Sequence, residues 1–244
     1  MGFSLLLRVI IAHLLADFFL QPYTWVSDKR LHHIKSRHLY YHIAIVGLLT
    51  YLLMLDWRAW ELPLFITVTH FVIDWWKSTR KDTMGVFVAD QAAHMLMIVT
   101  GWLIFSENLP NSSDFIFVTF RESGFWIVLT GYLLVLRPIG FLIEKATSQW
   151  RNELTSEKDE VSGLTNAGTW IGYLERVIIL TFILLQEYSA IGFLIAAKSV
   201  FRFSGGLKDN HERKHAEYIL IGTLISFSLA ILTGIGALSL LADG

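Results

Sequence analysis

The chain is predicted to be an all-α, polytopic transmembrane helix bundle of about eight helices, seven long and one short. Hydrophobic residues make up 54% of its 244 residues and charged residues only 17%, below the roughly 25% charge of a typical soluble domain. Apolar runs approach the roughly 20 residues that a helix needs to cross a bilayer. They lie at 3–20, 39–55, 61–77, 87–105, 124–144, 169–186 and 217–241, with a shorter run at 189–202. We therefore expect an integral membrane protein.

The first half, residues 1–123, is expected to hold four of these helices. The run at 3–20 should be retained, because no basic segment precedes it and no small-residue cleavage site follows it. Similar polar pairs in the four helices suggest a repeat of two hairpins, which the sequence alone does not prove. Residues 113–122 are expected to form either an interfacial strand or a half-helix.

The second half, residues 124–244, is expected to be helical as well. Pro138 should kink the helix over 124–144, because proline lacks a backbone N–H. The polar segment 145–168 is predicted to be a solvated cytoplasmic linker. Residues 186–189 separate the sixth run from the short one, which predicts a tight helical hairpin.

Lysines and arginines predict the orientation in the membrane. They gather in the loops 21–38, 77–86, 145–168 and 203–216 and are sparse on the opposite side. Basic loops face the cytoplasm, so both termini are expected to be extracytoplasmic. The net charge of −1 gives no reason to expect nucleic acid as a partner. The absence of cysteine excludes disulfides and thiolate metal sites.

Four of the expected helices carry pairs of metal-type side chains spaced i,i+4, so the members of each pair share one helix face. The pairs are His13 and Asp17, His38 and His42, His70 and Asp74, and Asp90 and His94. An acid or base at the centre of a membrane helix costs about 2.5–3.5 kcal/mol on insertion scales, and such residues usually face a partner or a cavity. The four pairs predict one site in the first half.

The helical rise of about 1.5 Å per residue gives these side chains a depth. Three histidines are expected about 10 Å inside the cytoplasmic helix ends and three aspartates about 5 Å inside them. The deep row is His13, His70 and His94, and the shallow row is Asp17, Asp74 and Asp90. His42 should lie near the acids, and His38 at the edge.

Histidine and carboxylate ligands without thiolate suit zinc, manganese or iron. We expect one or two divalent ions, zinc being favoured. The expected metal ligands are His13, Asp17, His42, His70, Asp74, Asp90 and His94, with His38, Gln21 and Gln91 at the edge or orienting the ligands. A metal-free proton relay or a polar packing cluster is the competing interpretation.

These residues favour a metal-dependent hydrolase that acts at the cytoplasmic leaflet on a lipid or another membrane-associated ester or phosphoester. One of Asp17, Asp74 and Asp90 could serve as the general base. Basic residues border the same mouth, where they could hold an anionic head group or only set the topology: Lys29, Arg30, Lys77, Arg80 and Lys81. A divalent-metal or proton-coupled transporter is the alternative function, and a noncatalytic, metal-stabilised scaffold or sensor is the second alternative. Substrate and oligomeric state are left open.

A separate polar cluster is expected in the second half, from Glu175, Arg176 and Lys198. Adjacent residues on a helix do not face each other, so Lys198 is the better expected partner for Glu175. A structural ion pair and a role in binding substrate phosphate both remain open.

Several segments resemble an uncharacterised bacterial membrane-protein family, domain of unknown function 3307. They are His13-Leu-Leu-Ala-Asp17-Phe-Phe-Leu-Gln21, His70-Phe-Val-Ile-Asp74, Asp90-Gln-Ala-Ala-His94, Ile171-Gly-Tyr-Leu-Glu175-Arg176 and Ala197-Lys198-Ser199. The resemblance covers most of the chain and implies a multi-pass protein of the bacterial inner membrane, but no activity. More loosely, the His/Asp pairs look like those of integral-membrane metal-dependent hydrolases such as the ceramidase and adiponectin-receptor group, an analogy of motifs only.

Overall fold

Each helix expected from the sequence forms in the computed structural model, which describes residues 2–56, 58–105, 123–155, 167–203 and 210–242. All the elements within these ranges are helical. The segment 113–122, expected to be a strand or half-helix, lies outside the described residues. The chain divides into two compact units, Met1–Thr130 and Gly131–Gly244, whereas the sequence suggested a division at residue 123.

The first unit begins with a broken helix. Helix α1 (Gly2–Leu14) continues as the π-helix η1 (Leu15–Phe19), after which the chain bends by 85°. Helix α2 (Tyr23–His32) and the short 3₁₀ helix η2 (His33–Lys35) follow. The basic segment 21–38, treated above as a loop, is therefore largely helical.

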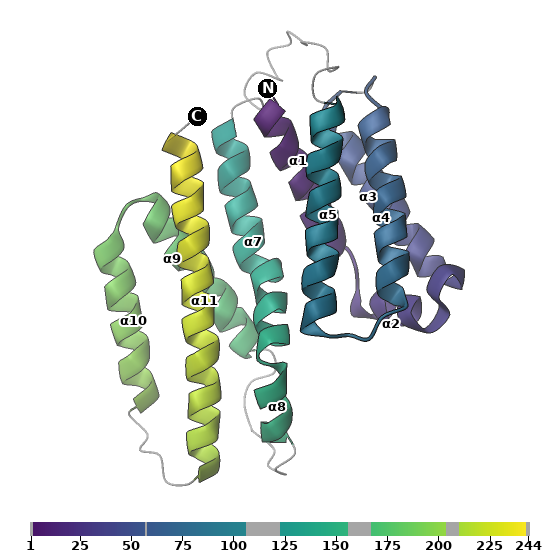
Figure 1. Ribbon diagram of the computed structural model, residues 1–244. Coiled ribbons are helices and arrows are strands. Elements are labelled where there is room, and N and C mark those ends of the chain that lie inside the picture. Colours follow the sequence, from purple (N-terminus) through teal and green to yellow (C-terminus); the bar gives the residue numbers. More distant parts are fainter. Residues whose placement is uncertain (1, 57, 106–122, 156–166, 204–209, 243–244) are drawn as a thin grey trace. The chain divides into compact units, whose positions relative to one another are not determined.

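Three further helices complete the core of the first unit. They are α3 (Arg37–Met54), α4 (Glu61–Ser78) and α5 (Met84–Phe105). Helices α1, α3, α4 and α5 run side by side, and α2 lies at the end of this group where α4 ends and α5 begins (Figure 1). Ser36 caps α3, because its Oγ accepts a hydrogen bond from the backbone N–H of Leu39.

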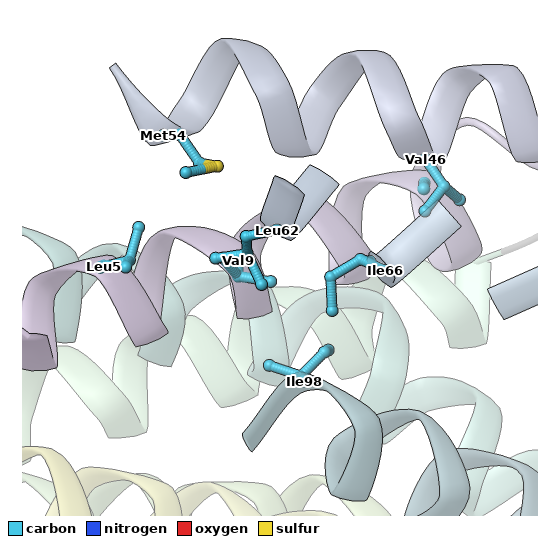
Figure 2. Close-up of a cluster of buried hydrophobic side chains, with 8 residues drawn as sticks. Leu5, Val9, Val46, Met54, Leu62, Ile66 and Ile98 are labelled. Carbon is cyan, nitrogen blue, oxygen red and sulfur yellow. The ribbon is translucent and has the colours of Figure 1, made fainter. Parts of the chain in front are cut away.

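A cluster of buried apolar side chains forms the core of this unit (Figure 2). It contains Leu5, Val9, Ala16, Val46, Met54, Leu62, Ile66 and Ile98. Four of these residues lie one helical turn from a histidine of the expected site, so they share its helix face. The neighbouring pairs are Val9 and His13, Val46 and His42, Ile66 and His70, and Ile98 and His94. The histidines therefore adjoin a dry apolar layer.

The second unit contains most of α7 (Ser123–Ala146), α8 (Ser148–Thr155), α9 (Ala167–Leu184), α10 (Tyr188–Phe203) and α11 (Asn210–Ala242). Helix α11 packs along α9, and Val135, Ile179, Leu180, Ile183 and Phe227 belong to the shared apolar core. Helix α8 lies within the segment predicted as a solvated linker, so part of that linker is helical.

Four helices of the described chain are long and apolar enough to cross a membrane: α5, α7, α9 and α11. The bent pair of α1 and α2 would add a fifth. Helices α3 and α4 carry histidines, Asp74 and terminal charges, which lower their average apolarity. Eight crossings and two extracytoplasmic termini remain predictions.

Candidate metal centre

Four histidine side chains from four helices meet inside the first unit. They are His13 of α1, His42 of α3, His70 of α4 and His94 of α5, and each is at most 2% exposed. The His70 ring stacks on the His94 ring, with centres 4.0 Å apart. Its centre also lies 5.1 Å from that of His42 and 5.6 Å from that of His13. His70 is thus the central histidine.

The Oδ1 atom of Asp17 faces three of these rings. It lies 3.3 Å from Nε2 of His42 and 3.3 Å from Nε2 of His70, and these two nitrogens are 3.0 Å apart. Nδ1 of His13 lies 3.7 Å from the same oxygen. Asp17 Oδ1 has no hydrogen-bond partner among the described residues. This oxygen and the facing nitrogens of His42 and His70 are close enough to hold one metal ion.

The π-helix η1 presents the Asp17 carboxylate. Within η1 the backbone N–H of Leu20 donates to the carbonyl of Leu15, a bond one residue longer than that of an α-helix. Such π-helical turns are rare, and many occur at functional sites. Here the wider turn holds Asp17 and ends just before the chain bends into α2.

Gln91 sets the orientation of His13. Its Nε2 donates to Oδ2 of Asp90 at 2.9 Å, so its Oε1 faces Nε2 of His13 at 3.3 Å. A carbonyl oxygen only accepts, so His13 carries its proton on Nε2 and leaves the Nδ1 lone pair free. Buried Nδ1 has no hydrogen bond among the described residues and is directed towards Asp17. Gln91 therefore fixes the orientation of the His13 ring, and its role beside a metal ligand stays a prediction.

The geometry of this group suits a divalent cation. Tetrahedral zinc with bonds of about 2.0–2.1 Å keeps its ligand atoms about 3.3 Å apart. The triangle of Asp17 Oδ1, His42 Nε2 and His70 Nε2 already has this spacing, and His13 Nδ1 is the nearest candidate for a fourth ligand. Buried polar atoms without partners cost free energy, and a cation would relieve that cost for Asp17 and His13.

The other two acids are held by lysines. Lys29 of α2 donates to Oδ2 of Asp74, and Lys77 of α4 donates to Oδ2 of Asp90, each at 2.5 Å. Asp17 is thus the one acid of the three without a lysine among the described residues. Lys29 and Lys77 thus bond to acids of the expected site, Lys29 buried and Lys77 partly exposed.

His94 and Asp90 form a second pair beside the centre. Nε2 of His94 lies 3.4 Å from Oδ1 of Asp90, and neither atom has a hydrogen-bond partner in the described parts of the chain. Two wider sets of candidate ligand atoms, each within 4.8 Å, include His94. One set is His13, His70 and His94, and the other is Asp74, Asp90 and His94.

Several of the remaining expected residues contact groups outside the centre. His38 binds Oδ2 of Asp28 and stacks on Trp25, with ring centres 5.5 Å apart. Arg30 pairs with Asp82 at 2.8 Å, and Arg80 and Lys81 are exposed. Gln21 has a buried amide nitrogen without a partner among the described residues.

Asp28 organises a surface cluster that the sequence analysis missed. Its carboxylate accepts hydrogen bonds from Ser36 at 2.5 Å and contacts His38 and His32, each at 2.8 Å. The hydrogen bonds from Ser36 and then His38 are the main reasons that the pKa of Asp28 falls to about 2. Asp28 and His32 have the same i,i+4 spacing as the site pairs, so this signal was present in the sequence.

In the second unit, Glu175 pairs with Lys198 and not with its neighbour Arg176. Oε2 of Glu175 lies 2.6 Å from Nζ of Lys198. Buried Arg176 instead donates to the carbonyl oxygens of Val135 and Leu136, just before Pro138, and to Oγ of Ser226 at 3.3 Å. Glu175, Arg176 and Lys198 thus bond within their own unit.

Comparison with known proteins finds a family match in the first unit. Residues 5–120 match the family described as "Protein of unknown function (DUF3307)", and this segment includes every candidate ligand of the centre. The segments quoted from residues 171–199 lie outside this match. No curated protein and no solved structure matches the chain.

Proposed function

We propose that the DUF3307 domain of this chain is a metal-dependent hydrolase of the bacterial inner membrane. It acts at the cytoplasmic leaflet on a lipid or another membrane-associated ester or phosphoester. The observation that carries this proposal is the triangle of Asp17 Oδ1, His42 Nε2 and His70 Nε2, with edges of 3.0–3.3 Å. Zinc fits it best, and manganese or iron would accept the same ligands.

Each residue of the centre has a role in this proposal. Asp17, His42 and His70 hold the ion, and His13 completes the set. A divalent ion supplies Lewis acidity and lowers the pKa of bound water towards about 7. His94 and Asp90 are placed to accept and return a proton, since His94 Nε2 and Asp90 Oδ1 are free of hydrogen bonds in the described residues.

The apolar layer next to the histidines supports a hydrolase over a carrier. Val9, Val46, Ile66 and Ile98 are at most 3% exposed, and they cover the side of the centre that faces away from α2. A carrier would need a polar route through this layer. A hydrolase needs access only from the side of α2, where the basic residues also lie.

Metal content of the purified protein is the decisive measurement. Freshly purified wild type should contain stoichiometric divalent metal, and the His13→Ala/His70→Ala variant should lose it. His38→Ala is the matched control, because His38 contacts Asp28 and not the centre. Folded wild type without stoichiometric metal would overturn the proposal.

Activity assays then separate the functions. A panel of membrane lipids should include a substrate that wild type hydrolyses and His70→Ala does not. Metal uptake into proteoliposomes that is lost in His70→Ala, without lipid turnover, would indicate a carrier instead. Loss of folding together with metal in His94→Ala, with no turnover by wild type, would indicate a metal-stabilised scaffold.

A further inference from the structure

We infer that Lys29 and Lys77 form an anion-binding subsite of this centre, so the group that reacts carries phosphoryl charge. The substrate class would then be a phosphoester and not an uncharged carboxylic ester. This inference rests on the proposed metal-dependent function and narrows it.

Both lysines lie where topology alone would not place them. Lysines that set orientation in a membrane lie in solvated loops, and lysine is rarely buried without a partner. Lys29 is only 5% exposed, because the bend after η1 returns α2 to the ends of the bundle helices (Figure 1). The Lys77 side chain is 22% exposed, so it marks the side from which a ligand can approach.

The two ammonium groups bond to acids that lie close together. Lys77 lies one turn after Asp74 on α4, yet it donates a hydrogen bond to Asp90 of α5. Asp74 instead accepts a hydrogen bond from Lys29 of α2. Asp74, Asp90 and His94 offer ligand atoms within 4.8 Å of one another. Three elements therefore bring both positive charges to the same end of the metal centre.

The charge balance of the buried group favours an anionic ligand over a neutral one once a metal is present. Asp17, Asp74 and Asp90 carry three negative charges, and Lys29 and Lys77 carry two positive ones, so the group with neutral histidines has one net negative charge. A divalent cation changes this to one net positive charge. An uncompensated charge in a low-dielectric interior is costly, and a phosphoryl group would balance it.

The lysines also retain hydrogen-bonding capacity for such a group. An ammonium has three donors, and within the described chain each of these two makes one side-chain hydrogen bond. The remaining donors can bind phosphoryl oxygens, and hydrogen bonds between charged groups are the stronger kind. An uncharged ester would offer these donors weaker acceptors than a phosphoryl group does.

The reaction is hydrolysis and needs no further reactant. The oxygen of water forms a bond to phosphorus as the bond between phosphorus and the alcohol oxygen breaks. One proton from water passes, through the Asp90 and His94 pair, to the departing alcohol oxygen. The products are the alcohol and the phosphate.

Orthophosphate binding to metal-loaded protein tests the subsite by titration calorimetry. Wild type should bind orthophosphate, and Lys29→Met and Lys77→Met should each weaken binding by about tenfold or more, as expected for loss of a charge-assisted hydrogen bond. Arg30→Met should leave it unchanged, because Arg30 pairs with Asp82. Lys77→Arg should retain binding, because the charge is kept.

Two further measurements identify the source of the phosphate and keep the test decisive. Phosphatidic acid in mixed micelles should displace orthophosphate if the subsite binds a lipid head group, whereas diacylglycerol should not displace it. If the protein binds orthophosphate but not phosphatidic acid, the substrate is a soluble phosphoester. Two results would overturn the subsite and leave the hydrolase proposal standing. One is metal-loaded wild type that binds no orthophosphate. The other is Lys→Met variants that keep normal metal content and normal affinity for orthophosphate. Absence of metal from wild type would overturn the hydrolase itself.

Discussion

Oδ1 of Asp17 lies 3.3 Å from Nε2 of His70, although one residue belongs to the π-helix that follows α1 and the other to α4. His42 of α3 completes the triangle. Three separate elements thus supply one set of ligand atoms, and the apolar residues one turn away hold their helices together. This relationship is the basis of the first two predictions.

Asp17→Asn should abolish stoichiometric metal binding while the fold is retained. The amide keeps the size of the carboxylate but removes the negative charge that strengthens binding of a divalent ion. Metal analysis of the purified variant, with circular dichroism as the check on folding, measures the effect. Asp56→Asn is the control, because the Asp56 carboxylate accepts the backbone N–H of Arg58 in an exposed turn. Normal metal content in Asp17→Asn would rule out Asp17 as a ligand.

Gln91→Leu should lower metal affinity by about 10–100-fold, the usual effect of removing a group that orients a ligand. The leucine no longer accepts from His13 Nε2 or donates to Asp90, so His13 loses its fixed protonation. Competition with a chelator of known affinity gives the change. Gln149→Leu, an exposed position in the second unit, should have no effect. Equal affinities in wild type and Gln91→Leu would contradict this role.

Asp28 should make stability depend on pH in the acid range. Its pKa is lowered from 3.8 to about 2 in the folded protein, so its carboxylate stabilises the fold fully above pH 3.8. That contribution is lost as the pH falls towards 2. Thermal unfolding of wild type and Asp28→Asn should therefore differ at pH 6 and converge near pH 2. A difference that grows as the pH falls would contradict the assignment.

Two glycines of α11 provide a matched test of the packing between α9 and α11. A Cβ at Gly234 would lie 2.8 Å from two methyl carbons of Ile183, whereas a Cβ at Gly236 would meet nothing within 4 Å. Gly234→Ala should therefore destabilise the protein by about 1–3 kcal/mol, as overpacking does. Gly236→Ala should be neutral or stabilise it by up to about 1 kcal/mol through helix propensity. Unfolding in denaturant measures both, and equal effects would disprove the close approach at Gly234.

Arg176→Lys should destabilise the second unit, although the charge is kept. The guanidinium bonds to two carbonyl oxygens of α7 and to Ser226 at once, and a single ammonium cannot reproduce this geometry. Gly172 leaves room for it, since a Cβ there would lie 3.0 Å from Nη1 of Arg176. Thermal unfolding should show a lower midpoint than in Arg151→Lys, an exposed position. Matching midpoints would show that the guanidinium contacts contribute little.

Local pattern was enough to predict the long apolar helices. Apolar runs placed α3, α4 and α9 within two residues of their ends in the structure, because each run must bury or shield its side chains over a full helix length. The helices α2 and α8 were missed because they are short and polar, so hydropathy carries no signal for them.

The sequence by itself determined which helix faces carry the candidate ligands, because i,i+4 spacing fixes the direction of side chains within one helix. Only the tertiary structure decided how those ligands are divided. His42 and Asp17 contact His70, while His94 stacks on His70 and keeps Asp90 of its own helix as a neighbour. Lys29 and Lys77 were joined to acids on other helices, although Lys77 lies closer in sequence to Asp74 than to Asp90. The physical reason is that a contact between helices depends on the rotation of each helix and on the bend after η1, and neither is encoded in the spacing of residues along one helix.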